Sequence, residues 1–185
     1  MRRPQSLHPL LAHRFSPASF DSAHVLSEAD VELLLEAARW APSAGNKQPW
    51  AFIVGLRGDE AHERLVARLA GSSASWAPDA SVLIANLSHV LVEETDWAFS
   101  EFSRYDLGQA VAHMTFQAQS MGLFVRQFRA FDRAGVAEDF DVPSHWEVTT
   151  ISALGAPCGS RLSRRVRERR ELTQLVWPEG ARSMS

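Results

Sequence analysis

The stretch that decides the fold is Ala37-Ala38-Arg39-Trp40-Ala41-Pro42-Ser43-Ala44-Gly45-Asn46-Lys47-Gln48-Pro49-Trp50-Ala51-Phe52-Ile53-Val54. It predicts the end of a helix, a tight polar turn and then an apolar strand. Amide and hydroxyl groups in a constrained turn suit a flat ligand that forms several hydrogen bonds. The structural alternative is a plain helix–strand connection in which Asn46 and Gln48 satisfy only nearby backbone groups.

Outward from this stretch, hydrophobic spacing and capping residues predict helices interleaved with a few strands. Ser27 followed by Asp30 indicates a helix start of the capping-box type, and Asp132 can begin a short helix. Helices are expected at residues 7–13, 27–40, 59–70, 97–121 and 132–140, and strands at 49–54, 81–87 and 148–154, with 126–132 irregular but strand-like. The pattern favours a three-layer α/β or α+β sandwich, as a single domain over residues 1–185 with a loose end at 1–6.

The expected helix at 97–121 is unusual because no charged residue occurs between Asp106 and Arg126. Its apolar residues are spread around the helix rather than along one stripe, and Gly122 can end it. Such a helix must be buried on most sides, and a small domain has little room to enclose it. We therefore expect part of its surface to be a subunit interface. The aromatic residues nearby could wall a substrate pocket, but we expect core packing for Trp97, Phe99 and Phe102.

The composition bounds the class of protein. The 185 residues, 45% of them hydrophobic, suffice for one globular domain with a sizeable core. A net charge of −3 favours neither nucleic acid nor an anionic membrane as a partner. The single cysteine, Cys158, can form no internal disulfide, and no Cys/His cluster has metal-ligand spacing. Because there is no apolar stretch of about 20 residues and no signal-peptide core, the expected compartment is the cytoplasm.

Two groups of basic residues are candidates for binding an anion. Arg14 and Ser16 flank Phe15, so in an extended loop their side chains point the same way and can grip a phosphate. An exposed arginine without such a role is the common alternative. In the second group, Glu168 and Glu171 interrupt the cations and weaken a nucleic-acid interpretation. That group comprises Arg161, Arg164, Arg165, Arg167, Arg169 and Arg170.

Residues Ala41 to Trp50 fit the pattern Ala-Pro-Ser-x-x-Asn-x-Gln-Pro-Trp, which resembles the signature of the nitroreductase family of FMN-dependent flavoproteins. Other matching segments extend the resemblance over residues 7–177. It implies an α+β fold with a mainly antiparallel central sheet flanked by helices, built as an intertwined homodimer. It also implies FMN as cofactor and NADH or NADPH as co-substrate.

The resemblance assigns roles to several segments. Arg14 and Ser16, with Phe15 between them, and the pair Arg167 and Arg169 would hold the FMN phosphate. The turn would line the isoalloxazine ring and ribityl chain, in a site formed at the dimer interface, through Pro42, Ser43, Ala44, Asn46 and Gln48. The backbone amides of Arg129 and Ala130, just before the Phe131-Asp132 pair, would contact flavin N5 and O4. Ser73 stands where many relatives carry an asparagine that contacts the pyrimidine edge.

The chain also departs from the family pattern. Ala18 stands where relatives have a second basic residue in the phosphate segment, and Phe124 stands where they have a glycine. Trp76 stands where some relatives have a lysine near N1 and O2 of the flavin. Since a cation there would stabilise the anionic reduced flavin, these departures leave the redox potential open.

The activity implied by the resemblance is flavin-centred oxidoreduction. A nicotinamide delivers a hydride to flavin N5, and a nitroaromatic, a quinone or a similar small acceptor then takes the electrons in a ping-pong reaction. Because the cofactor carries the chemistry, no catalytic side chain and no metal are expected. Two alternatives stay open: an FMN carrier or sequestering protein, and a specialised flavin oxidase or flavin-fragmenting enzyme on the same fold.

Overall fold

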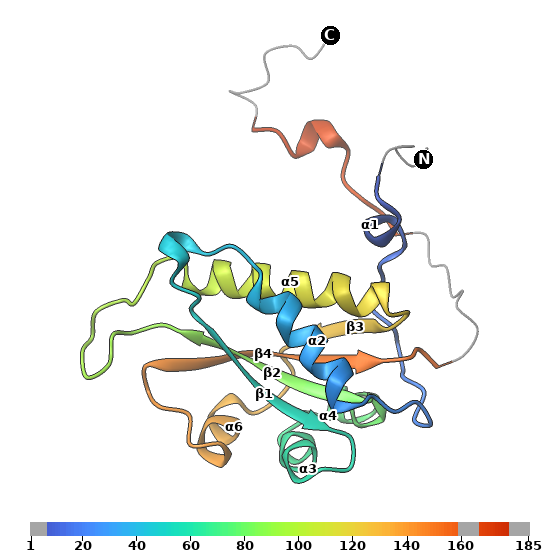
Figure 1. Cartoon of the computed structure of the whole chain (residues 1–185), viewed down its shortest axis with the longest axis horizontal. Coiled ribbons are helices and arrows are strands. Elements are labelled where there is room, and N and C mark those ends of the chain that lie inside the picture. Colours follow the sequence, from blue (N-terminus) through green and yellow to red (C-terminus); the bar gives the residue numbers. More distant parts are fainter. Residues whose placement is uncertain (1–6, 159–166, 178–185) are drawn as a thin grey trace.

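A four-stranded antiparallel sheet forms the centre of the computed structural model, which describes residues 7–158 and 167–177 (Figure 1). The strands lie in the order β1-β2-β4-β3. Their bounds are β1 Trp50–Leu56, β2 Val82–His89, β3 Phe124–Phe128 and β4 Trp146–Gly155. The three predicted strands are confirmed as β1, β2 and β4, and the strand-like stretch contributes β3, which begins two residues earlier than expected.

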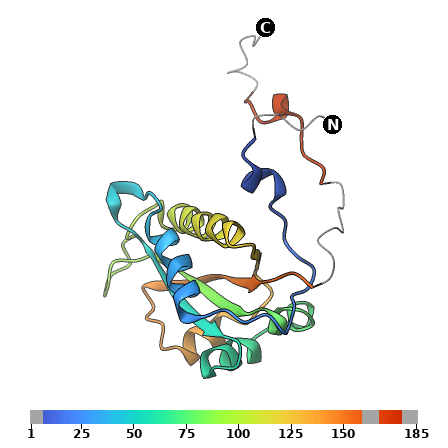
Figure 2. The ribbon, with the colours of Figure 1, turned by 45° about the vertical axis from the view of Figure 1, so that its right-hand side comes forward.

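Helices cover both faces of this sheet and complete the predicted three-layer α+β sandwich (Figures 1 and 2). A hydrophobic core lies on each face of the sheet. Side chains of β2 alternate between these two cores, because successive residues of a strand face opposite ways. On one face lie α2 Glu28–Arg39 and α5 Ser103–Ser120, and on the other lie α3 Glu60–Ala67, α4 Gly71–Ala74 and α6 Arg133–Asp139. The short elements are α1 Pro9–His13, η1 Ala44–Asn46, η2 Ala77–Asp79 and η3 Leu172–Gln174.

The predicted helix starts are confirmed where a side chain caps the helix. The Ser27 hydroxyl accepts the Asp30 backbone N–H at 3.2 Å, and the Asp30 carboxylate accepts the Ser27 N–H at 3.0 Å. Asp132 likewise accepts the Gly135 N–H at 3.1 Å and starts α6. These bonds satisfy amide groups that the first turn of a helix leaves without a partner.

The helix α3 ends at Ala67 rather than at the predicted Ala70, because the next residues bond to another segment. The Ala70 N–H donates to the Ala130 carbonyl at 3.1 Å, and the Asp132 N–H donates to the Arg68 carbonyl at 2.9 Å. Between these bonds, Leu69 forms an isolated antiparallel bridge with Phe131. The end of α3 therefore holds the segment around residues 129–131 in place.

Gly55 of β1 allows α3 to pack directly on the sheet. A Cβ atom at this position would lie 2.6 Å from the backbone nitrogen of His62 in α3. No side chain fits into that space, so glycine is needed for the backbone of α3 to approach β1 here.

The helix α5 begins at Ser103, six residues later than predicted. The preceding residues form a loop that bonds to itself, with Val92 N–H donating to the Trp97 carbonyl at 2.8 Å and Phe99 N–H donating to the Val90 carbonyl at 3.0 Å. One face of α5 is buried, whereas the opposite face stays open and Tyr105 is 69% exposed. One face is therefore open in a single chain, and the prediction that part of this surface forms a subunit interface stays a prediction. Among the described residues, no helix is long and apolar enough to span a membrane.

The segment 167–177 lies beside α1, away from the sheet (Figures 1 and 2). Arg167 Nη2 donates to the Ala12 carbonyl of α1 at 2.8 Å. The segment carries large exposed apolar side chains, namely Leu172, Leu175, Val176 and Trp177. The predictions made for residues 1–6 and for Arg161, Arg164 and Arg165 lie outside the described residues.

Candidate functional site

Arg14 and Ser16 face the same cavity, as their spacing predicts. Arg14 Nη1 donates to Ser16 Oγ at 3.4 Å. Phe15 points elsewhere and packs on Phe124 of β3, with ring centroids 4.3 Å apart. The cavity has a volume of about 260 Å³ and is lined by Arg14, Ser16, Ala112, Thr115, Phe116, Val125 and Gln127. A cation and a hydroxyl therefore share a cavity whose wall comes from α5 and β3.

Two polar residues of this cavity were not predicted from the sequence. Gln127 Nε2 donates to Thr115 Oγ1 at 3.3 Å, and Thr115 Oγ1 donates to the Val111 carbonyl within α5 at 2.7 Å. The sequence offered only a lone threonine in an apolar helix, Thr115, and a polar residue in a strand-like stretch, Gln127, as signs of this part of the cavity. Neither side chain can be placed in the cavity before the packing of α5 on β3 is known.

The turn between α2 and β1 is held in an uncommon backbone conformation. Gly45, Asn46 and Gln48 all have positive φ angles, of 60°, 55° and 50°. Such angles disfavour most side chains, and asparagine and glycine tolerate them best. Ser43 Oγ accepts the Gln48 backbone N–H at 2.9 Å, and Gln48 Nε2 donates to Asn46 Oδ1 at 3.3 Å. The exposed amides of Asn46 and Gln48 are thereby fixed side by side.

Asp106 anchors this turn from α5 and was also missed by the sequence analysis. Its carboxylate accepts the Ala44 backbone N–H at 3.0 Å and Gln109 Nε2 at 3.3 Å, and the residue is only 2% exposed. Lys47 adds a second anchor by donating to the Phe99 carbonyl at 2.8 Å. Pro42 is exposed on the rim of the turn. The turn is therefore held by bonds to α5 and to the loop before it.

The two predicted groups lie at different ends of α5 in one chain (Figure 1). The turn bonds to Asp106 in the first turn of the helix, whereas the cavity of Arg14 is lined by Thr115. Nine residues of helix separate the two positions by about 14 Å. The structure therefore does not bring the turn and the Arg14–Ser16 segment together within a single chain.

Ser73 and Ala130 do come together. The Ser73 hydroxyl donates to the carbonyls of Ala130 and, at 2.9 Å, Ala70, and the residue is 1% exposed. Arg129, the neighbour of Ala130, is exposed, with its guanidinium 5.6 Å from the centre of the Phe131 ring. Ser73 thus positions the 129–130 backbone, while its own hydroxyl is engaged inside the chain.

Arg167 and Arg169, the pair near the C-terminus that was predicted to hold the phosphate, have different surroundings. Arg167 bonds to Ala12, two residues before Arg14. Arg169 is exposed, and its Nη1 donates to the neighbouring Glu168 carbonyl at 2.8 Å. Of the pair, Arg167 lies beside the N-terminal segment.

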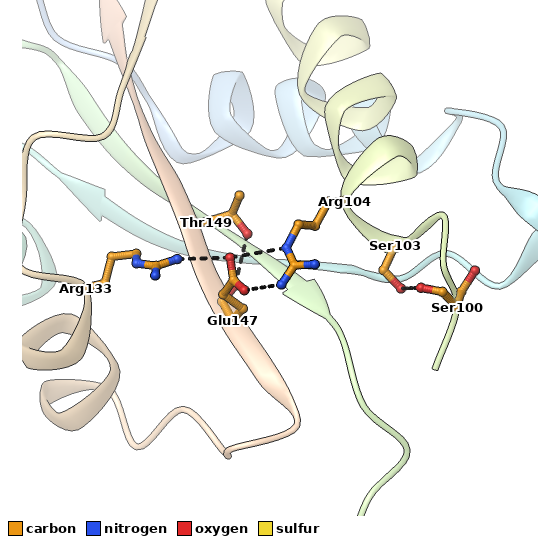
Figure 3. A network of polar contacts seen from close by, with 6 residues as sticks. All are labelled: Ser100, Ser103, Arg104, Arg133, Glu147 and Thr149. Atoms are coloured by element: carbon orange, nitrogen blue, oxygen red, sulfur yellow. Dashed lines mark hydrogen bonds and ion pairs between the residues drawn. The ribbon is translucent and has the colours of Figure 1, made fainter. Parts of the chain in front are cut away.

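A polar network fixes the first turn of α5, which carries Asp106 (Figure 3). Glu147 of β4 accepts Arg104 Nη2 at 2.5 Å and Arg133 Nη1 at 3.0 Å. The hydrogen bond from Arg104 is the largest influence that lowers the pKa of Glu147 below its ordinary value of 4.5. One carboxylate therefore joins β4 to the starts of both α5 and α6.

The loop before α5 is pinned by an aromatic stack. His89 lies between Phe99 and Trp146, with ring centroids 3.8 Å and 4.6 Å apart, and burial lowers its pKa. The prediction of core packing for Trp97 and Phe102 is wrong, because Trp97 is 77% exposed and Phe102 is also exposed. Within the described ranges, no group of three His, Cys, Asp or Glu residues could hold a metal ion.

Comparison with known proteins identifies the class. The model of the Nitroreductase family matches residues 11–156, and the chain belongs to that family. A protein of Streptomyces coelicolor, named as an NADH dehydrogenase/NAD(P)H nitroreductase, is 28% identical over 154 residues, which are 72% of this chain and 75% of the relative.

Solved structures agree with this assignment. A crystal structure described as an oxidoreductase containing FMN is 28% identical, covers 85% of this chain and 80% of its own, and has a TM-score of 0.78. A nitroreductase from Exiguobacterium sibiricum, solved in complex with FMN, shares the fold with a TM-score of 0.78 at 16% identity, over 95% of this chain and 98% of its own.

Proposed function

We propose that this protein oxidises NADH or NADPH and reduces a nitroaromatic, a quinone or a similar small acceptor by a ping-pong mechanism. That it is an FMN-dependent oxidoreductase follows from its family and from the FMN-containing relatives. When bound, FMN accepts the hydride and passes the electrons on, so the chain itself must bind and orient. The cavity that Arg14 and Ser16 share with α5 is the observation that carries the proposal.

The residues of this cavity fit a phosphate. Its described lining offers a guanidinium, two hydroxyls and an amide, and contains no carboxylate that would repel an anion. A guanidinium matches the geometry of phosphate oxygens well. We assign phosphate binding to Arg14, Ser16, Arg167 and Arg169, with Phe15 holding the segment on β3. We assign contacts to the flavin ring to the backbone of Arg129 and Ala130, which Ser73 positions.

We infer that the functional unit is a homodimer, because the turn and the Arg14–Ser16 cavity stand apart in one chain. A second copy would bring its own Pro42, Ser43, Ala44, Asn46 and Gln48 to the cavity of the first. The open face of α5 borders an apolar cavity of about 520 Å³, lined partly by Leu10, Leu33, Trp40 and Phe116. Together with the exposed apolar residues of the segment 167–177, this surface is suited to contact with a second chain.

Cofactor identity gives the first test. Purified protein should be yellow, and acid extraction followed by chromatography should release FMN. Recovery of FAD, or failure of the apoprotein to bind added FMN, would contradict the proposal. Light scattering at micromolar concentration should give about twice 20.6 kDa, and a monomer that still binds FMN would contradict the shared site.

Turnover gives the second test. Steady-state oxidation of NADH and NADPH should respond to added nitroaromatics or quinones, with the parallel-line kinetics of a ping-pong mechanism. Absence of any turnover with bound FMN would instead indicate a carrier. Oxygen consumption with an organic substrate, and no response to the acceptors, would indicate an oxidase.

A further inference from the structure

Arg126 of β3 bonds to the main chain of the segment 14–18. Its Nη1 donates to the carbonyl oxygens of Pro17 and Ala18, at 3.3 Å in each case. Within the described ranges, the backbone of residues 14–18 takes part in no other hydrogen bond. The side chain of Arg126 is therefore what fixes this length of main chain to the sheet by hydrogen bonds.

The guanidinium of Arg126 is itself fixed by Trp76. Its carbon lies 3.8 Å from the centre of the Trp76 ring, and this tryptophan is only 8% exposed. Trp76 Nε1 donates to the Ser72 carbonyl at 2.9 Å, and the Phe128 ring packs edge-on with its centroid 5.0 Å away. Among the described residues, no carboxylate forms an ion pair with Arg126 that would draw it from the two carbonyls. A planar guanidinium stacked on a fixed ring loses little further freedom when it donates.

Arg126 lies on the face of β3 opposite to the cavity assigned to the phosphate. Its strand neighbours Val125 and Gln127 line that cavity, and alternate residues of a strand face opposite ways. Arg14 and Ser16 reach the same cavity from the segment that Arg126 bonds to. The position of these two side chains over the cavity therefore depends on a residue that does not line it.

We propose that Arg126 is a positioning residue for phosphate binding, which acts through the main chain that carries Arg14 and Ser16 and touches no part of the ligand. The inference rests on the proposed function, because it requires the FMN phosphate in the Arg14–Ser16 cavity. A guanidinium binds phosphate well only when its donors are held in the right geometry. Without Arg126, the segment would have to be ordered at the moment of binding, and that entropic cost lowers the affinity.

The first test compares the affinity of the full-length protein for FMN and for riboflavin, which lacks the phosphate, by flavin fluorescence. Arg126→Met keeps a long side chain against Trp76 but cannot donate to the two carbonyls. It should weaken FMN binding about tenfold and leave riboflavin binding unchanged. Arg126→Lys can still donate and should bind FMN within about threefold of wild type. Thermal unfolding checks the fold of each variant, and Arg126→Gln replaces Arg126→Met if the latter is unfolded.

The double variant Arg14→Ala/Arg126→Met shows whether Arg126 acts through the segment. When Arg14 is absent, its position no longer matters, so adding Arg126→Met should weaken FMN binding by only about twofold or less. A direct contact between Arg126 and the phosphate would instead make the two losses multiply.

Cleavage by trypsin after Arg14, identified by mass spectrometry, reports on the segment without any flavin. A segment released from Arg126 opens more often, so Arg126→Met should be cut at least about threefold faster than wild type. Arg57→Met is the matched control, because Arg57 also donates to two backbone carbonyls, those of Asp79 at 2.8 Å and His24 at 2.6 Å, but outside this segment. Its cleavage after Arg14 and its FMN affinity should stay at the wild-type level.

Four results would overturn the inference. Unchanged FMN affinity in Arg126→Met would exclude any role in binding, and equal losses for FMN and riboflavin would indicate a general effect on the fold. Losses that multiply in the double variant would assign Arg126 to a direct contact with the phosphate. Trypsin cleavage after Arg14 at the wild-type rate would show that Arg126 does not fix the segment. These outcomes leave the proposed function intact, whereas wild-type protein that binds neither flavin would refute the proposed function and this inference with it.

Discussion

The two ends of α5 differ in how their polar groups are partnered. At its start, Asp106 accepts the backbone N–H of Ala44 in the turn, and Arg104 is paired with Glu147, so each of these charged groups has a partner inside the chain. Near its other end, Arg14 and Ser16 face a cavity in which the described lining holds no carboxylate. The first end provides a fixed shape, and the second provides a positive charge that no carboxylate of the described residues pairs with. A flavin nucleotide needs both a shaped surface for its ring and a cation for its phosphate, which is why we expect two chains to share each site.

The largest expected effect lies at the start of α5. Asp106→Ala removes a buried carboxylate and leaves the Ala44 N–H without its acceptor, so we expect a loss of about 2–3 kcal/mol in the free energy of unfolding. Urea titration followed by circular dichroism measures it. Glu101→Ala, an exposed carboxylate just before the same helix, is the control and should change little. Equal stability of the two variants would show that the turn is not anchored by Asp106.

At the Arg14–Ser16 cavity, we expect substitutions to change the affinity for FMN rather than the stability of the fold. Arg14→Ala removes a charge-assisted contact to phosphate, which is commonly worth about 1.5–3 kcal/mol, or roughly ten- to a hundredfold in FMN affinity. Fluorescence titration of the apoprotein measures the change, with Arg64→Ala on α3 as the control. If Arg14→Ala binds FMN as wild type does, the phosphate lies elsewhere and the cavity assignment should be abandoned.

A smaller effect is expected at Ser73, which belongs to neither end but positions the 129–130 backbone. Ser73→Ala should destabilise the protein by about 1 kcal/mol. The loss is modest because the Ala130 carbonyl still accepts the Ala70 N–H. Ser72→Ala, an exposed neighbour, provides the matched comparison. A loss from Ser73→Ala no greater than that from Ser72→Ala would remove the positioning role.

The smallest effect concerns pH at the start of α5. The pKa of Glu147 is lowered in the folded protein, so its contribution is present above the ordinary value of 4.5 and is lost as the pH falls below it. Glu147→Gln should cost less than about 1 kcal/mol near neutral pH, since Arg104 is 63% exposed and the pair is screened by water. Unfolding measured between pH 7 and pH 3 should show this difference shrinking toward the acid side. A constant difference would contradict the linkage.

Local signals in the sequence predicted local structure well. The caps at Ser27 and Asp132 and the polar turn after α2 depend on residues only a few positions apart, and each is present in the structure. Contacts between distant segments could not be predicted. Asp106 meets Ala44 across 62 residues, and Arg126 meets Ala18 across 108. Their roles depend on how α5 and β3 pack, which hydrophobic spacing alone does not determine.

The two errors in helix length have the same origin. The helix at 97–121 was predicted too long because its first residues bond across their own loop, with Val90 and Val92. The helix α3 was predicted too long because Leu69 and Ala70 bond to the segment at 130–131. In both places a backbone contact made outside the helix replaces the helical one. Helical spacing of apolar residues continues through such a boundary and cannot reveal it.

The close packing at Gly55 has a consequence for engineering. Because α3 lies directly on β1 at this residue, any added side chain must push the helix outward, and the end of α3 is bonded to the backbone at 130–132. A substitution at this residue of β1 would thus displace the backbone at 129–130 that we assign to the flavin ring, without touching the ligand itself. Libraries built to change acceptor preference should keep glycine at position 55 constant, so that changes selected around the pocket are not confounded by displacement of an entire helix.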